Sequence, residues 1–182
     1  MKKTISFRDW LIIASVAGFS LEGLTAEKPE RIGKRKTMEN FEDVPLGTIV
    51  DLSRIPKEGN ALSRMVEITM GMTAKEVAKS KATEVVLYAI WLTNQLERVN
   101  KLFDKLKSAP SAMELQAGID RLNFGIFGMV DEYARRMGIT DHEEVMRTPW
   151  SIVYKCIEMD YQKAQFERRY AKLMENKIRS KK

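Results

Sequence analysis

The sequence predicts an all-α protein, with a long central helix, a C-terminal helical bundle and an irregular N-terminal region. Three stretches begin with the Ser/Thr-x-x-Glu pattern of a capping box. In this box the hydroxyl and the glutamate each accept a hydrogen bond from a backbone amide at the helix start. An apolar stripe at intervals of three and four residues follows the first box, as in an amphipathic helix. The boxes are Thr73 to Glu76, Ser111 to Glu114 and Thr140 to Glu143.

Residues 1–45 are predicted to form an N-terminal helix, over residues 4–19, and a linker. The apolar run from Trp10 to Leu21 also fits a secretory signal peptide, which is the alternative. Charged residues directly before and after this run favour a helix of a cytoplasmic protein over an export signal. No apolar segment approaches the ~20 residues that a membrane-spanning helix requires, so we expect no membrane contact.

Residues 46–182 are predicted to form one all-helical domain. The apolar runs in residues 46–72 are too short to separate strands from helices by periodicity, and we favour helices because the downstream sequence is helical. Residues 74–107 are predicted to form the long central helix, with a break near Ser80–Thr83. The apolar stripe of this helix comprises Val85, Ala89, Leu92, Leu96, Val99, Phe103 and Leu106.

The segment Val85–Leu92 of the long helix is apolar on nearly every face. A helix with this pattern is enclosed by other elements or meets a partner. The sequence leaves open whether that cover comes from the same chain or from another. Tyr88, Trp91 and Leu92 are therefore candidate partner-binding residues.

Four further helices are predicted in the C-terminal part, over residues 112–124, 129–137, 141–147 and 150 to about 178. Thr148 before Pro149 is the expected cap of the last helix, because proline suits the first helical position. The apolar face expected on this helix comprises Trp150, Val153, Tyr154, Ile157, Tyr161, Ala164 and Tyr170.

The net charge of +6 is concentrated at the C-terminal end of the chain. Residues 161–182 carry eight basic and two acidic side chains, whereas residues 111–160 carry five basic and nine acidic ones. Arg168, Arg169 and Tyr170 are therefore candidates for docking to an acidic protein surface. Nucleic acid is the alternative partner, but the basic residues spread around a helix instead of lining one face, so we do not expect it.

The sequence contains no pattern typical of catalysis or of metal binding. His142, the only histidine, lies in an acidic first turn of a predicted helix, and Cys156, the only cysteine, lies on an apolar helix face. Asp120, Asp131 and Glu132 lack the Glu-x-x-His partner of dimetal helical bundles. Neither glycine-rich phosphate-binding pattern occurs. We therefore expect no enzymatic activity, no metal and no cofactor.

Several segments carry a resemblance to known proteins: Ala89 to Asn100, Leu115 to Gly125, Asp131 to Ala134, Gly138 to Thr140, Glu143 to Val145, Thr148 to Trp150 and Phe166 to Tyr170. Together they resemble a group of small phage and prophage proteins of gut bacteria. The layout of that group is similar to that of the tail assembly chaperones of long-tailed phages. The resemblance covers residues 60–178 and leaves out the first 45 residues.

This resemblance implies a non-enzymatic factor of phage morphogenesis that acts in the bacterial host cytoplasm. Its partner would be the tape measure protein, a long helix with apolar stripes, which the chaperone coats until tail tube subunits polymerise around it. Other tail or virion proteins are further candidate partners, as is a second copy of the chain. One alternative is a virion structural protein of the neck, connector or cargo kind, and the other is a basic helical nucleic-acid-binding protein.

Overall fold

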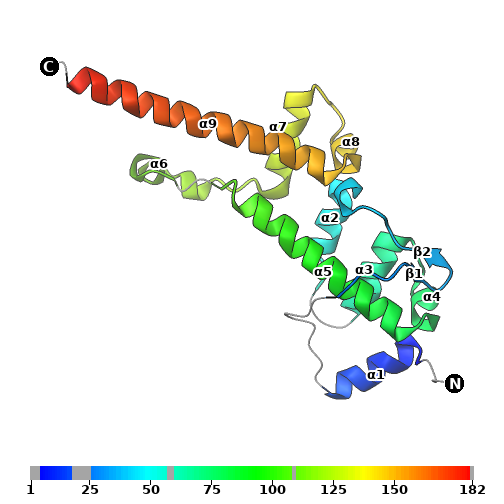
Figure 1. The fold of residues 1–182 in the computed structure, drawn as a ribbon. Helices are drawn as coiled ribbons and strands as arrows, with labels where there is room; N and C mark the ends of the chain where they lie inside the picture. The colour runs from blue at the N-terminus through cyan, green and yellow to red at the C-terminus, as the bar shows by residue number, and fades with distance from the viewer. Residues whose placement is uncertain (1–4, 18–25, 57–59, 108–109, 181–182) are drawn as a thin grey trace. The chain divides into compact units, whose positions relative to one another are not determined.

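The computed structural model describes residues 5–17, 26–56, 60–107 and 110–180, and most of these residues are helical (Figure 1). The all-α prediction is confirmed. The chain divides into two compact units, which we call unit 1, residues 1–101, and unit 2, residues 102–182. The sequence predicts a boundary at residue 45, whereas the described residues before it belong to the same unit as the following helices. Ile32 and Phe41 are buried in unit 1, and this non-local packing holds the predicted linker there.

Unit 1 begins with helix α1, a short antiparallel hairpin and a 3-10 turn. The hairpin pairs Ile32 with Arg35, and Gly33 occupies the left-handed region at its turn. Four described helices follow, and α2 and α3 confirm the helical prediction for residues 46–72, of which residues 57–59 lie outside the described part. The elements are α1 (Phe7–Ala17), β1 (Arg31–Ile32), β2 (Arg35–Lys36), η1 (Phe41–Asp43), α2 (Leu46–Ser53), α3 (Ala61–Met70), α4 (Ala74–Lys79) and α5 (Ala82–Asp104).

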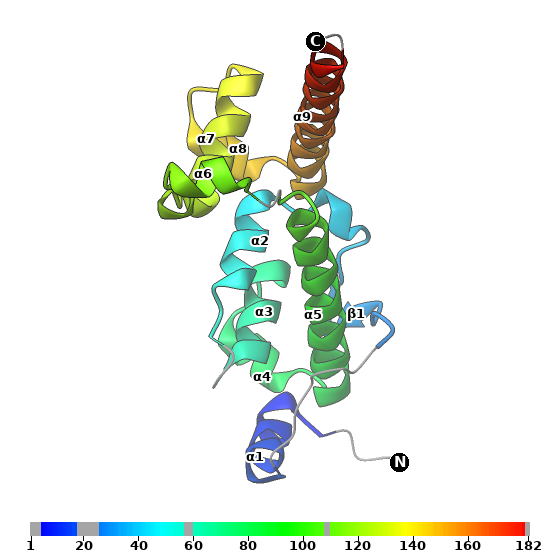
Figure 2. The same cartoon turned by 90° about the vertical axis from the view of Figure 1, so that its left-hand side faces the viewer.

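The core of unit 1 is built on α5, with α2, α3 and α4 alongside it (Figure 2). The predicted stripe of α5 is the face that is buried, from Val85 to Val99. Val66 of α3 and Val77 of α4 are fully enclosed beside it. Burying a side chain of this size stabilises the fold by about 1.5–3 kcal/mol, so this stripe accounts for much of the stability of unit 1.

The predicted break in the long helix is confirmed, because α4 ends at Lys79 and α5 begins at Ala82. The chain between them pairs with the strand-like start of α1. The amide of Phe7 donates to the Ser80 carbonyl at 2.9 Å, and the amide of Ala82 donates to the Ile5 carbonyl at 3.1 Å. The Ser80 carbonyl and the Ala82 amide have no helical partner at the break, and they are hydrogen-bonded instead to the backbone of Phe7 and Ile5.

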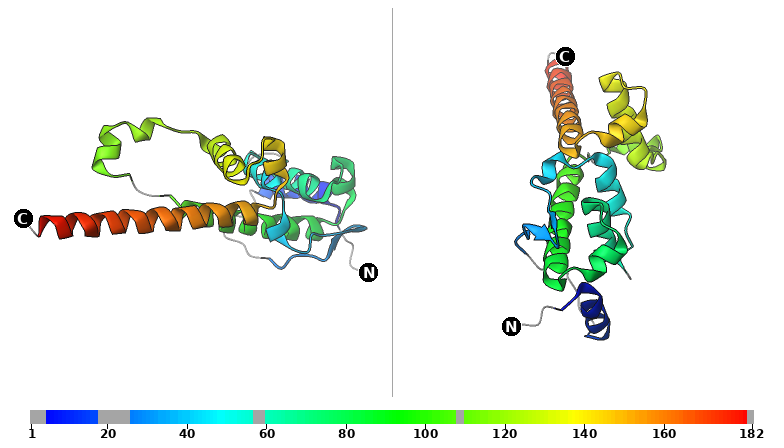
Figure 3. Two further views of the ribbon diagram at one scale, coloured as in Figure 1. Left: turned by 90° about the horizontal axis from the view of Figure 1, so that it is seen from above. Right: turned by 90° about the vertical axis from the view of Figure 1, so that its right-hand side faces the viewer.

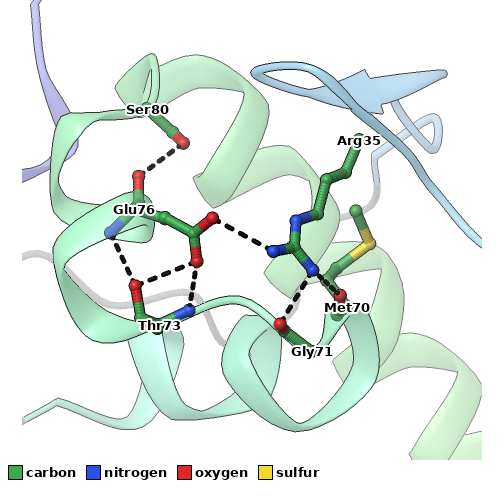
Figure 4. Close-up of polar contacts among 6 residues, drawn as sticks. All are labelled: Arg35, Met70, Gly71, Thr73, Glu76 and Ser80. Atoms are coloured by element: carbon green, nitrogen blue, oxygen red, sulfur yellow. Dashed lines mark hydrogen bonds and ion pairs between the residues drawn. The ribbon is translucent and has the colours of Figure 1, made fainter.

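A polar cluster joins the hairpin to the α3–α4 corner (Figure 4). Arg35 donates to the carbonyls of Met70, at 3.1 Å, and Gly71, at 2.8 Å, and pairs with Glu76 at 3.0 Å. Glu76 also accepts hydrogen bonds from the amide and the hydroxyl of Thr73, which completes the predicted capping box. The cluster therefore provides hydrogen-bond partners for the Met70 and Gly71 carbonyls at the end of α3 and for the Thr73 amide that precedes α4.

The capping box at Thr73 is expected to make unit 1 sensitive to acid. Hydrogen bonds from the Thr73 amide and hydroxyl, and then from Arg35, hold the pKa of Glu76 below its ordinary value of 4.5. The stabilisation is complete above that ordinary value and is lost as the pH falls through the lowered pKa of the folded state. Replacing Thr73 with alanine should cost about 1 kcal/mol at neutral pH.

Urea unfolding monitored by circular dichroism between neutral pH and about pH 3 measures this effect. We expect Glu76→Gln to lower the stability at neutral pH and to make the decline in acid shallower. Thr73→Ser, which keeps the hydroxyl, is the control and should behave like the natural chain. An unchanged acid limb in Glu76→Gln would contradict the prediction.

Unit 2 contains α6 (Ala112–Gln116), the 3-10 turn η2 (Ile119–Arg121), α7 (Gly125–Met137), α8 (His142–Arg147) and α9 (Trp150–Arg179). Helix α7 packs against α8 and against the first turns of α9 (Figure 3). The single helix predicted over residues 112–124 is wrong, because Gly118 adopts φ +86° and the helix ends at Gln116. A left-handed residue interrupts helical hydrogen bonding, and only a 3-10 turn follows it.

Two of the predicted helix caps in the C-terminal part are also corrected. The box at Ser111 forms as predicted, but Asp141 instead of Thr140 caps α8 and accepts from the Glu143 amide at 2.9 Å. The hydroxyl of Thr148 donates to the Glu144 carbonyl at 3.0 Å, so it caps the C-terminal end of α8 and does not cap the start of α9. Neighbouring candidates within one turn compete for a cap, and the local chain direction decides between them.

Candidate functional site

The six candidate partner-binding residues fall into two groups, one in each unit. Tyr88 and Leu92 of α5 are fully buried in the core of unit 1, and Trp91 beside them is half-buried. Arg168, Arg169 and Tyr170 lie on α9 in unit 2 and are exposed. Most of the apolar segment of α5 is therefore covered by its own chain, and Leu87 is the member that is left exposed, at 41%.

Aromatic packing holds the α5 group in place. The rings of Tyr88 and Trp91 stack at 5.7 Å, Phe41 meets Trp91 edge-on at 5.7 Å, and the Lys28 ammonium lies over the Trp91 ring at 5.6 Å. Burial raises the pKa of Tyr88. Its hydroxyl lies near Thr69, whose Oγ1 donates to the Met65 carbonyl at 2.8 Å, and within the described residues this buried hydroxyl makes no hydrogen bond. This group is thus a structural core and not an accessible surface.

The accessible surface is a second stripe, on α9, which the sequence analysis did not single out. Four apolar side chains recur at intervals of seven residues along this helix and are 49–67% exposed. Tyr170 and Met174 extend the same side of the helix, and the rings of Phe166 and Tyr170 stack at 6.1 Å. We call this surface the α9 stripe; its repeating members are Ile152, Met159, Phe166 and Leu173.

The inward face of α9 explains why the stripe is left open. Trp150 and Val153 are buried, and the ring of Phe103 meets Tyr154 at 5.3 Å and Trp150 at 6.5 Å. These residues belong to the apolar face that the sequence analysis expected. Successive helical residues are about 100° apart, so Trp150, Val153 and Tyr154 point away from the stripe, whereas Tyr170, which was expected on the same face, lies on the stripe side. The signal that identifies the stripe in the sequence is its seven-residue spacing.

Polar contacts anchor α9 on its other sides. Arg136 of α7 donates to the Cys156 carbonyl at 2.8 Å and pairs with Asp160. Arg168 pairs with Glu114 of α6 at 3.5 Å, and it lies on the helix face opposite Phe166. Both contacts therefore orient α9 with its stripe outward.

A further apolar surface of unit 2 is one that we call the α7 groove. It is a cavity of about 750 Å³, within the size range of ligand-binding clefts. Phe124 and Phe127 are 68% and 64% exposed there. Gly128 leaves room for Phe124, because a Cβ at this position would lie only 2.6 Å from the Phe124 Cβ. The lining residues are Phe103, Leu106, Lys107, Phe124, Gly125, Phe127, Gly128, Met129, Asp131, Glu132, Arg135 and Ile157.

The charged residues of the α7 groove differ in how they are paired. Arg135 pairs with Asp131 at 3.0 Å, and Lys107 pairs with Asp104 at 2.6 Å. Within the part of the chain that the structure describes, Glu132 has no ion-pair partner. The groove therefore combines aromatic walls with an uncompensated carboxylate.

The residues considered for chemistry are not brought together. The Nε2 atom of His142 lies 3.5 Å from Asp131, and its ring meets Phe127 edge-on at 5.2 Å. Cys156 is a free, half-buried thiol on α9. Among the described residues, no group of three or more His, Cys, Asp or Glu side chains is placed to hold a metal ion. Nor does any described helix have the length and apolar character needed to cross a membrane.

No protein-family model matches this chain, and no curated protein or solved structure matches it significantly. The role of the two apolar surfaces must therefore follow from their own geometry. A straight, exposed stripe with a seven-residue repeat suits a second helix, because helices that lie side by side contact each other at such intervals.

Proposed function

We propose that this chain is a non-enzymatic factor of phage morphogenesis, of the tail assembly chaperone kind. In this role it binds the helical tape measure protein in the host cytoplasm and keeps it soluble before the tail tube polymerises. The observation that supports the proposal most is the α9 stripe, where Met159, Phe166 and Leu173 are exposed along one line of a 30-residue helix. A partner helix laid along this line would bury them.

The size of the stripe indicates how such a partner is held. Fully burying one such side chain is worth about 1.5–3 kcal/mol. The stripe residues are already about half covered in the free chain, so four of them supply about 3–6 kcal/mol on association. Association costs at least about 4 kcal/mol in lost freedom of motion. One copy therefore binds a single helix weakly, and tight binding requires many copies along a partner with repeated apolar stripes.

The charges beside the stripe specify the chemistry of the partner. Lys163 and Lys177 lie in line with the apolar residues, and Arg169 and Lys172 flank them. These cations favour an amphipathic helix whose apolar face is bordered by aspartate and glutamate. Complementary charges of this kind set the register and increase the association rate more than they increase the affinity.

Co-expression tests the proposal directly. If a very long reading frame lies beside this gene, as expected for a tape measure protein, its product should be insoluble alone and soluble together with this chain. The two proteins should then purify as one complex with several copies of this chain. An insoluble long product in both cases, or no complex, would contradict the proposal.

Mass spectrometry of purified phage particles separates a chaperone from the alternative, a structural component of the virion. A chaperone leaves before the tail is complete, so its peptides should be missing from the particles. Peptides of this chain at the level of known particle proteins would favour a neck, connector or cargo role instead.

A further inference from the structure

The α9 stripe raises the question of what covers it before a partner arrives. Within the described part of unit 2, the α7 groove does not cover the second half of the stripe, because α9 is one continuous helix and carries part of the groove's lining near its start. Ile157 itself lines that groove, and Phe166 lies nine residues further along the same rigid helix. At 1.5 Å per residue, Phe166 lies about 13 Å along the helix from Ile157, so Phe166 and Leu173 cannot fold back onto the groove of their own copy.

A parallel second copy of α9 is a poor cover for the same stripe. Two parallel helices in register would place Lys163 against Lys163 and Lys177 against Lys177, and like charges directly opposite each other disfavour this arrangement. An antiparallel pair centred on the stripe would place Arg169 opposite Cys156 and avoids that repulsion, so pairing of α9 with α9 is the alternative that the experiment must separate.

The α7 groove of another copy fits the stripe better. Its walls include the exposed rings of Phe124 and Phe127, which would take apolar side chains such as Phe166 and Leu173. Glu132 in the groove is a carboxylate with which a lysine or arginine beside the α9 stripe can form an ion pair. The same complementarity extends over the sequence, with net charges of −4 for residues 111–160 and +6 for residues 161–182.

We propose that free copies of this chain associate head to tail, with the second half of α9 of one copy in the α7 groove of the next. The inference builds on the proposed function only in treating the α9 stripe as a binding surface. It adds regulation of that surface: another copy shields the stripe until a partner helix displaces it. Because the contact joins two different surfaces, it generates rings or open chains instead of a symmetric dimer.

Mixing two variants of the full chain tests this contact without any partner protein. The stripe variant carries Phe166→Asp and Leu173→Asp, and the groove variant carries Phe124→Asp and Glu132→Lys. Sedimentation velocity should show that the natural chain forms species larger than dimers as its concentration rises. Each variant alone should raise the dissociation constant at least ~10-fold, as expected for loss of central interface residues.

The decisive sample is an equimolar mixture of the two variants. Each variant keeps one intact half of the contact, so the mixture should form a one-to-one heterodimer and nothing larger. Circular dichroism on each variant checks that the helical content is retained. If the groove variant loses its fold, Glu132→Lys alone is the second test and should still weaken association, most strongly at low salt.

Three outcomes would overturn the inference. One is a natural chain that stays monomeric at every concentration. Another is a folded groove variant that associates like the natural chain, which would indicate pairing of α9 with α9. The third is a mixture that remains monomeric. None of them depends on whether the stripe binds a tape measure helix, so this inference and the proposed function fail separately.

Discussion

Replacing Phe166 and Leu173 with aspartate is expected to weaken binding of the long helical partner at least ~100-fold without unfolding the chain. Both side chains are exposed in the free protein, so their loss removes little from its own packing. In a complex each would be buried, and an aspartate there would be desolvated without a partner. Binding to the immobilised long product, measured by surface plasmon resonance, gives the size of the effect.

The opposite face of α9 offers a matched control. Ala164 and Ala171 are also exposed and also seven residues apart, but they lie on the side of the helix away from the stripe. Ala164→Asp with Ala171→Asp therefore introduces the same charge at the same spacing. We expect near-natural binding from this control. Equal losses in the two double variants would show that charge, and not the stripe, controls the interaction.

Replacing Leu92 with alanine is expected to destabilise unit 1 by about 2–5 kcal/mol. Leu92 is fully buried among the side chains that α5 presents to α2, α3 and α4, so its truncation leaves a cavity. A loss of this size is a large part of the 5–15 kcal/mol that typically stabilises a domain. Leu87→Ala on the same helix is the control, because Leu87 is 41% exposed and should cost less than about 1 kcal/mol.

Hydrogen exchange resolved by peptide mass spectrometry measures this prediction for each unit. Peptides of unit 1 should lose protection in Leu92→Ala, while those from α7 and α8 should keep theirs. A uniform loss across residues 5–180 would contradict the division of the chain into two compact units. Retained protection in α5 would contradict the placement of Leu92 in the core.

Local chemistry explains which parts of the fold were predictable. Thr73 and Ser111 start their helices through contacts three residues away, and the break predicted near Ser80–Thr83 falls between Lys79 and Ala82. Such short-range signals are present in the sequence itself. Gly118 belongs to the same class, but its left-handed conformation was not anticipated, and the helix predicted through it was wrong.

The candidate surface was only half predictable. Arg168, Arg169 and Tyr170 were selected as part of a basic segment and all lie exposed on α9, but only Tyr170 lies on the same side as the stripe, and Arg168 lies on the opposite face. Tyr88 and Leu92 were selected for excess apolar character and lie in the core. Composition cannot distinguish these cases, because an apolar helix face looks the same whether its cover comes from the same chain or from another.

The sequence by itself determined the all-α class, the helix starts at Thr73 and Ser111, and the concentration of positive charge in residues 161–182. These properties depend on neighbours within one or two turns, or on simple counts. The tertiary structure alone decided that the hairpin belongs with the helices of unit 1, that α5 is enclosed, and that the α9 stripe is open. Burial depends on which distant segments pack together, and no local pattern records that choice.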